Sequence, residues 1–334
     1  MFLICITLIS LYLLSGVNIY HHPKSNSFKI YQLDKKATEA LKGILILIVT
    51  FSHLTAYIDC GIIKEICNYG ALAVSVFFFI SGYGLMKSLI YRKDYLTNFI
   101  SKRFSKILPP IIIVTIIYIP LKVYFDGTNL YQLLKDLAKG HTLTPYAWYI
   151  YAIILYYLSF YTTFKIIKRK NIAIAFVFIM IILYTGIIKY LNWGAWWYIS
   201  SFAFPMGLLY AYHEQKIIEL LYIKSRVSTT LIYLANIFIL LYCALGTYFM
   251  WPGWGGIMYN LIPLLIMPIL YSFNLERIHI LRFLGRISYE IYILHGIFIQ
   301  VGEKYFDSYF LIIFVCVFSI TSAYYLNKTV HYLN

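Results

Sequence analysis

Long apolar stretches recur along the whole chain and constrain its fold more than any other feature. About 20 apolar residues cross the roughly 30 Å hydrocarbon core of a bilayer, so runs of this length are typical of transmembrane helices. Such windows lie near residues 2–20, 37–58, 69–91, 107–124, 146–166, 172–191, 196–213, 228–249, 256–273, 287–302 and 309–327. They leave no segment long enough for a separate soluble domain. We therefore predict an all-α fold, a polytopic membrane helical bundle of about 11 transmembrane helices.

The composition excludes a water-soluble enzyme. Of the 334 residues, 61% are hydrophobic and only 12% are charged, whereas soluble domains carry about 25% charged residues. The net charge of +15 lies in short clusters between apolar runs, a pattern that indicates membrane orientation rather than nucleic-acid binding. The five cysteines contain no C-x-x-C pair, and no metal site is expected. Cys60 and Cys67 share one loop, where free thiols are the favoured interpretation and a disulfide the alternative.

The distribution of lysine and arginine predicts the orientation in the membrane. Loops on one side of the predicted spans hold 19 of these residues, and loops on the other side hold 4, namely Lys64, Lys135, Lys139 and Lys304. The positive-inside rule makes the first side cytoplasmic, with the N-terminus outside and the C-terminus inside. The first span lacks a basic start and an A-x-A site, so we interpret it as a retained anchor. Abundant Ile, Lys and Tyr suggest a bacterial source, hence a multi-pass protein of the bacterial plasma (inner) membrane.

The second predicted span carries two polar groups, Lys42 and His53, whose burial in a membrane costs free energy. They are 11 residues apart, which at about 100° and 1.5 Å per residue puts both on one helix face, about 16 Å apart. Glu39 precedes Lys42 by three residues and can pair with it. The structural interpretation is that His53 packs against neighbouring helices and that Lys42 snorkels to the membrane interface. Imidazole suits a general base or a transient acyl acceptor, and the pairing with Lys42 favours function.

Other polar groups near the spans have strong structural explanations. Lys87, Lys122, Lys165 and Lys189 lie near helix ends, where snorkelling accounts for them. Ser81 belongs to a small-residue stretch that favours helix packing. A role as nucleophile is the less favoured interpretation, because Ser81 lacks the strand-to-helix elbow of hydrolase serines. Lys102, Arg103 and Lys106 cluster in an inside loop, before Pro109 and Pro110 start or kink the next helix. Topology alone explains positive charge there, but arginine also offers a fork for phosphate.

The tenth predicted span has a polar stripe formed by Ser288, Tyr292 and His295. Their i, i+4, i+7 spacing keeps them within about 60° around the axis, where they line a cavity or bond another helix. A direct catalytic role for His295 is the less favoured interpretation, and Glu290 points away from it. Aromatic residues at predicted span ends are interpreted mainly as an interfacial belt: Tyr146, Tyr149, Tyr151, Tyr156, Tyr157, Tyr161, Trp193, Trp196, Trp197, Trp251 and Trp254.

These residues together resemble membrane acyltransferase family 3, the multi-pass O-acyltransferases of surface carbohydrates. The most specific element is the family's Arg-or-Lys, ten-residue, His motif, here Lys42 to His53 preceded by Glu39; arginine is commoner at the first position. The segments FFFISGYG, KRFSKILP and RISYEIYILH match further family motifs in the expected order. YAWYIYAIILYYLSFY and AFPMGLLYA look like its middle helices. The resemblance covers 33–327, between an N-terminal anchor and linker at 1–32 and a cytoplasmic tail at 328–334.

The resemblance implies transfer of an acetyl group from cytoplasmic acetyl-CoA, or of another acyl group from acyl-CoA, to a hydroxyl of a cell-surface or lipid-linked polysaccharide. It implies a catalytic set and a donor-binding set among the residues above. The catalytic candidates are His53, Lys42 and Glu39, the donor-binding candidates are Arg103, Lys106 and Ser81, and the cavity candidates are His295, Tyr292, Ser288 and Trp148. The expected partners are acyl-CoA, the carbohydrate acceptor and membrane lipids, with no metal and no nucleic acid.

Three other classes of membrane protein compete with this interpretation. A transporter or flippase of lipid-linked sugars would also place polar residues in spans, but no repeated half or pair of broken helices is evident. A glycan polymerase usually needs large outside loops with arginines, and the predicted outside loops hold none. A purely structural membrane protein fits least well with Lys42 and His53 inside one span.

Overall fold

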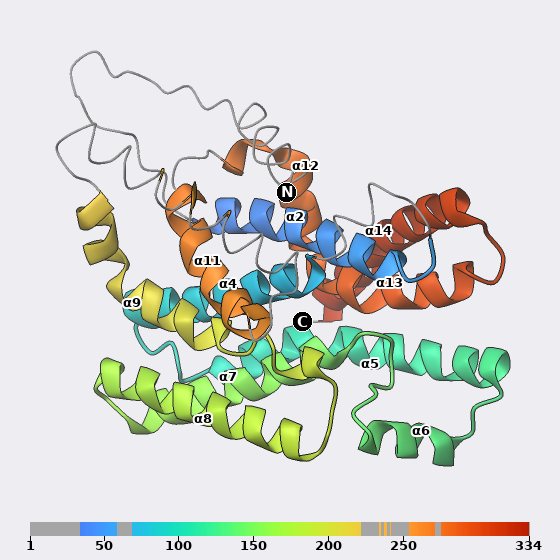
Figure 1. Ribbon diagram of the computed structural model, residues 1–334, viewed down its shortest axis with the longest axis horizontal. Helices are drawn as coiled ribbons and strands as arrows, with labels where there is room; N and C mark the ends of the chain where they lie inside the picture. Colours follow the sequence, from blue (N-terminus) through green and yellow to red (C-terminus); the bar gives the residue numbers. More distant parts are fainter. Residues whose placement is uncertain are drawn as a thin grey trace. The chain divides into compact units, whose positions relative to one another are not determined.

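The computed structural model is all-helical in the part of the chain that it describes (Figure 1). The described residues are 34–58, 69–221, 254–270 and 275–333, with four more between 234 and 241. They form 11 α-helices, two short 3₁₀ turns and no β-strand. The predicted anchor at 1–32, the predicted span at 228–249, and both Cys60 and Cys67 lie outside the described residues. The predicted all-α fold is confirmed for the residues described.

Several predicted spans coincide with helices. Five helices among the described residues are long and apolar enough to cross a membrane: α2 (Lys35–Leu54), α4 (Gly70–Tyr91), α5 (Phe99–Asp126), α8 (Lys170–Tyr190) and α14 (Ser308–Leu333). The remaining helices are α6 (Leu130–Ala138), α7 (Trp148–Ile166), α9 (Ala203–Leu221), α11 (Trp254–Leu270), α12 (His279–Arg286) and α13 (Ser288–Gly302), with 3₁₀ turns η1 (Ala195–Trp197) and η2 (Leu275–Arg277). The chain is therefore a multi-pass membrane protein, and the count of about 11 spans stays a prediction.

Helix α5 starts earlier than predicted, and this moves the cationic cluster from a loop onto a helix. It has 28 residues and contains Pro109 and Pro110 in its interior rather than at its start. At 1.5 Å per residue such a helix is about 42 Å long, longer than a hydrocarbon core of roughly 30 Å. Its first turns, which carry Lys102, Arg103 and Lys106, can thus continue the helix beyond the apolar region.

Two other boundaries differ from the prediction. The segment between the predicted spans 107–124 and 146–166 contains a further helix, α6. Its start is capped by Asn129, whose side-chain oxygen accepts a hydrogen bond from the backbone nitrogen of Gln132 at 2.8 Å. The predicted span at 196–213 is not one helix, because η1 ends at Trp197 and α9 begins only at Ala203. The side-chain amide of Asn260 satisfies the backbone in this break, accepting from Ala203 N and donating to the carbonyl of Ile199, both at 2.8 Å.

The chain divides into two compact units, and each is built around close helix contacts. The first comprises residues up to 45, 71–90 and 199–286, within the limits of what is described. Here α4 and α9 approach closely at Gly82 and Gly207, since a Cβ at either position would collide with the other helix's backbone. Helices α2 and α12 meet in the same way at Gly43 and Gly285. Small residues allow such approach between membrane helices, as predicted for the stretch around Gly82.

The second unit comprises residues 46–70, 91–198 and 287–334. Helices α13 and α14 pack along one another, as do α7 and α8 (Figure 1). Leu54 and Ile58 of the segment that ends α2 bury against Ile299 of α13 and against Leu311 and Val315 of α14. This apolar cluster fixes the end of α2 beside α13, which determines where His53 lies.

Two of the sequence interpretations are wrong. Lys87 does not simply snorkel, because its ammonium forms an ion pair with Glu214 of α9, which also accepts a 2.6 Å hydrogen bond from the hydroxyl of Tyr83. The carboxylate is buried, so a paired cation is what stabilises it there. Tyr156 and Tyr157 are likewise buried among helices rather than placed in an interfacial belt. An aromatic-rich sequence does not by itself separate these two environments.

Candidate functional site

The second unit brings two histidines together from opposite ends of the chain. His53, in the last turn of α2, and His295, in the middle of α13, approach to 2.7 Å between Nδ1 of His53 and Nε2 of His295. Their rings are nearly parallel, with centroids 5.0 Å apart. His295 is fully buried, whereas His53 is half-buried. The pair therefore combines a half-buried histidine with a fully buried one that supports it.

The backbone of α13 determines which nitrogens of the neutral pair carry protons. Nδ1 of His295 lies 3.2 Å from the carbonyl oxygen of Ile291, one turn earlier. A carbonyl only accepts, so this contact requires a proton on that nitrogen and leaves Nε2 of His295 as an acceptor. Nδ1–H of His53 then donates to it. The tautomer of His53 fixed in this way has its lone pair on Nε2, the atom that a base or a nucleophile needs.

Tyr146 packs against one face of the His53 ring. The two rings stack with centroids 3.8 Å apart and planes 5° from parallel. Tyr146 has a φ of 59°, in the left-handed region that side chains rarely adopt. Its carbonyl accepts a hydrogen bond from the hydroxyl of Tyr292, which stabilises this conformation. Unusual backbone conformations of this kind often occur at functional sites.

Gly296 allows the segment before α7 to lie against α13. A Cβ at this position would come within 2.8 Å of both Pro145 and Tyr146. The glycine directly follows His295, so the segment before α7 approaches α13 next to its buried histidine. Glu290 lies apart from the pair, as predicted, because it accepts a 2.8 Å hydrogen bond from Asn327 of α14.

Arg103 is held by aromatic side chains in the same unit. Its guanidinium donates to the hydroxyl of Tyr95 at 2.7 Å and lies over the rings of Phe99 and Tyr157, with 5.9 and 5.7 Å to the centroids. Arginine carries five N–H donors, so one bond to Tyr95 leaves most of the fork for another acceptor. Lys106, one turn further along α5, is exposed.

The remaining predicted site residues are distributed over both units. In the first unit, Glu39 and Lys42 lie on α2, where Glu39 has an ion pair with Lys35 at 3.8 Å, and Ser81 is half-buried in α4. Lys42 and His53 do share one uninterrupted helix, as predicted. In the second unit, Ser288 is buried at the start of α13. Trp148 opens α7 and packs against the ring of Trp197, 6.3 Å between centroids.

Sequence reasoning missed Tyr146 and underrated His295. Tyr146 was interpreted as a belt residue because it opens an apolar window, and no local pattern reports its contact with His53. His295 could have ranked higher, since a histidine inside a membrane span and next to a glycine indicates a specific partner. That partner is 242 residues away in sequence. The described residues contain no group of three or more His, Cys, Asp or Glu side chains placed to hold a metal ion.

The helical architecture and the histidine pair define a multi-pass membrane protein with a polar centre among its helices. A family model described as an acyltransferase domain matches residues 35–328. The chain therefore belongs to membrane acyltransferase family 3, and it is an acyltransferase by that membership. No curated protein and no solved structure matches it significantly.

Proposed function

We propose that this membrane acyltransferase transfers acetyl from cytoplasmic acetyl-CoA to a hydroxyl group of a cell-surface or lipid-linked polysaccharide. The observation that carries the proposal is the hydrogen bond from His53 to His295, within the residues that match the family. It gives a half-buried imidazole a defined tautomer, which is what proton transfer or acyl capture requires.

The chemistry begins at Nε2 of His53. As a base, it takes the proton of the acceptor hydroxyl while that oxygen attacks the thioester carbonyl; the C–S bond breaks, and the CoA thiolate leaves and receives the proton. As an acyl carrier, the same lone pair attacks the carbonyl first, the C–S bond breaks and CoA leaves as the thiolate; the acceptor hydroxyl then attacks the acyl carbon, the C–N bond to the imidazole breaks, and the hydroxyl proton goes to the thiolate. Both routes need the tautomer that His295 supports. Positioning by a neighbouring hydrogen bond also lowers the loss of freedom on reaching the transition state.

Arg103 and Lys106 suit the phosphates of the donor. Both lie in the first turns of α5, an end of the helix that the positive-inside rule assigns to the cytoplasm. The aromatic contacts of Arg103 hold the guanidinium in one orientation, and a fixed planar fork binds phosphate oxygens in pairs. In this proposal the donor also contacts Ser81 and Lys42, which lies on the same helix as His53. Glu39 stabilises the positively charged start of α2, where it pairs with Lys35.

The proposed setting is a bacterial plasma membrane, with the N-terminus outside and the C-terminus inside. The half of α2 that ends in His53 then faces the outer side, where a lipid-linked or surface glycan is available. In this proposal the cavity that receives the substrate is lined by Trp148, Tyr292 and Ser288. The supporting evidence is the excess of Lys and Arg in the loops assigned to the inside.

The test is a transfer assay in membranes from cells that express the chain and from cells without it. The probes are acetyl-CoA labelled in its acetyl group and the host surface polysaccharide, stripped of O-acetyl esters by mild alkali. We expect label in the polysaccharide that alkali releases as acetate, only with the expressing membranes. Equal label in both preparations contradicts the proposal. Movement of lipid-linked sugar across the membrane without label transfer would favour a transporter instead.

A further inference from the structure

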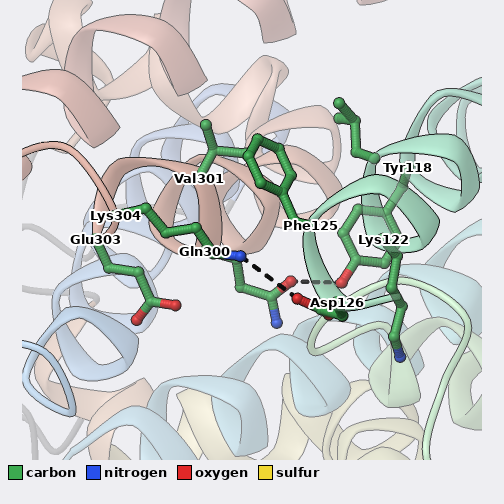
Figure 2. A pocket seen from close by; sticks show the side chains of 9 residues that line it. Tyr118, Lys122, Phe125, Asp126, Gln300, Val301, Glu303 and Lys304 are labelled. Carbon is green, nitrogen blue, oxygen red and sulfur yellow. Dashed lines mark hydrogen bonds and ion pairs between the residues drawn. The ribbon is translucent and has the colours of Figure 1, made fainter. Parts of the chain in front are cut away.

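An open pocket lies in the second unit where α5 and α13 end. It has a volume of about 100 Å³ and is shown in Figure 2. Polar side chains of both helix ends line it: Tyr118, Lys122, Asp126, Gln300, Glu303 and Lys304. A small pocket of this kind leaves room for the hydroxyls along one edge of a sugar ring.

The charges in the pocket are balanced. Lys122 and Lys304 oppose Asp126 and Glu303, and Lys304 forms an ion pair with Asp126 at 3.4 Å. A phosphate site would show an excess of positive charge, and a site for a cation would show an excess of carboxylates. A neutral mixture of donors and acceptors instead matches hydroxyl groups, each of which both donates and accepts.

Hydrogen bonding within the pocket orients the groups that remain for a ligand. The buried hydroxyl of Tyr118 donates to the side-chain oxygen of Gln300, which directs the amide nitrogen of Gln300 away from that contact. Figure 2 shows this nitrogen, the carboxylate of Glu303 and the ammonium of Lys122 all on the lower side of the view. The pocket thus presents an amide donor, an ammonium donor and the carboxylate of Glu303 toward the same side.

Helix α13 connects the pocket to the histidine pair. Gln300 of α13 and Glu303, directly after the helix, follow His295 by five and eight residues. At 1.5 Å per residue these positions lie about 8 and 12 Å along the helix axis from His295. A glycan held in the pocket therefore lies about one to two helix turns from the histidine pair.

We propose that this pocket binds the acceptor: it holds hydroxyl groups of a neutral sugar residue next to the one that receives the acyl group, with Glu303, Gln300 and Lys122 as hydrogen-bonding partners. The proposal rests on the proposed function, since it assigns the acceptor end of that site. It also explains why α13 carries His295 in its middle and ends, one to two turns further on, at a charge-balanced rim.

The experiment compares Glu303→Ala with Asp136→Ala in the full chain. Asp136 is a carboxylate on α6, predicted to lie on the same side of the membrane, that does not line the pocket. A hydrogen bond to a charged group is stronger than one between neutral groups, so removing Glu303 should raise the KM for de-O-acetylated polysaccharide roughly tenfold. The KM for acetyl-CoA should stay within about twofold. Glu303 is exposed, and Gln300→Met provides a second variant in case one of them folds poorly.

A binding measurement separates this proposal from the proposed function. The purified chain in detergent is titrated with de-O-acetylated polysaccharide in the absence of acetyl-CoA, and the same shift in Kd is expected for Glu303→Ala. If the wild-type chain transfers acetyl but Glu303→Ala and Gln300→Met keep its KM and Kd, the pocket proposal is wrong and the function stands. If the wild type transfers nothing yet binds the glycan through Glu303, the pocket stands and the function is wrong.

Discussion

Nδ1 of His53 and Nε2 of His295 lie 2.7 Å apart, although the two residues are separated by 242 positions in sequence. The contact joins the end of α2 to the middle of α13 and places a half-buried imidazole against a fully buried one. Because Nδ1 of His295 faces the carbonyl of Ile291, the direction of the hydrogen bond follows from the backbone. The site is thus a relay that starts at a main-chain oxygen and ends at Nε2 of His53.

The relay predicts that His295 acts through His53. His295→Leu should lower kcat about 10- to 100-fold, since the lost hydrogen bond contributes about 1.5–3 kcal/mol to a group that gains charge. His295→Gln should recover part of the loss, because its amide oxygen can accept from His53. Kinetics of acetyl transfer measure both, with exposed His331→Leu as the control. If the glutamine variant is as impaired as the leucine variant, the role of His295 is in packing alone.

Stacking on Tyr146 predicts a difference between two substitutions at that position. Tyr146→Phe keeps the ring against His53, and we expect kcat close to that of the wild type. Tyr146→Ala removes the ring, and stacked aromatic pairs contribute about 0.5–1.5 kcal/mol, so kcat should fall up to about tenfold. Tyr190→Ala, on the exposed side of α8, is the matched control. Equal activity of the alanine and phenylalanine variants would contradict a positioning role for the ring.

The aromatic cage around Arg103 predicts an effect on donor binding. Arg103→Ala should raise the KM for acetyl-CoA about tenfold, more than it lowers kcat at saturating donor, because phosphate contacts bind ground state and transition state alike. Arg103→Lys should restore charge without the fork and recover only part of the affinity. Arg169→Ala, an exposed arginine before α8, should leave KM unchanged. An unchanged KM in Arg103→Ala would move the CoA site elsewhere.

The buried ion pair of Lys87 with Glu214 predicts a cost in stability. Glu214→Ala leaves a half-buried ammonium and the hydroxyl of Tyr83 without their acceptor, and removal of one partner of a buried pair costs about 3 kcal/mol. Thermal unfolding in detergent should show a clearly lower Tm than for Glu219→Ala, an exposed glutamate on the same helix. The double variant Glu214→Leu with Lys87→Met should recover much of the loss. Equal Tm values for Glu214→Ala and Glu219→Ala would show that the pair contributes little.

The sequence predicts the helices more reliably than their ends. Hydropathy locates α4 and α8 almost to the residue, because their apolar windows and their helices coincide. It fails at the start of α5, since Lys102, Arg103 and Lys106 favour a helix but lower the mean hydropathy of the window. It also fails at 196–213, where the side-chain amide of Asn260 stabilises a break that an apolar window conceals.

The site likewise combines features that a single helix determines with features that depend on tertiary packing. The spacing of Lys42 and His53 is a property of one helix, and the structure has both on α2. The contact of His53 with His295 arises from tertiary packing of the Leu54 and Leu311 cluster, which no single helix encodes. The left-handed backbone at Tyr146 is similarly a result of its bond to Tyr292 and of the space that Gly296 leaves.

The measurement that tests the account most directly is acetyl transfer by the purified chain with and without the imidazole of His53. Wild-type protein and His53→Ala, both confirmed as folded and membrane-inserted, are given acetyl-CoA labelled in its acetyl group and de-O-acetylated surface polysaccharide. Base catalysis by one residue contributes about 10²–10⁴-fold, so the account predicts a loss of at least 100-fold in kcat in the variant. Activity within about twofold of the wild type, a change of only about 0.4 kcal/mol in the barrier, would contradict it.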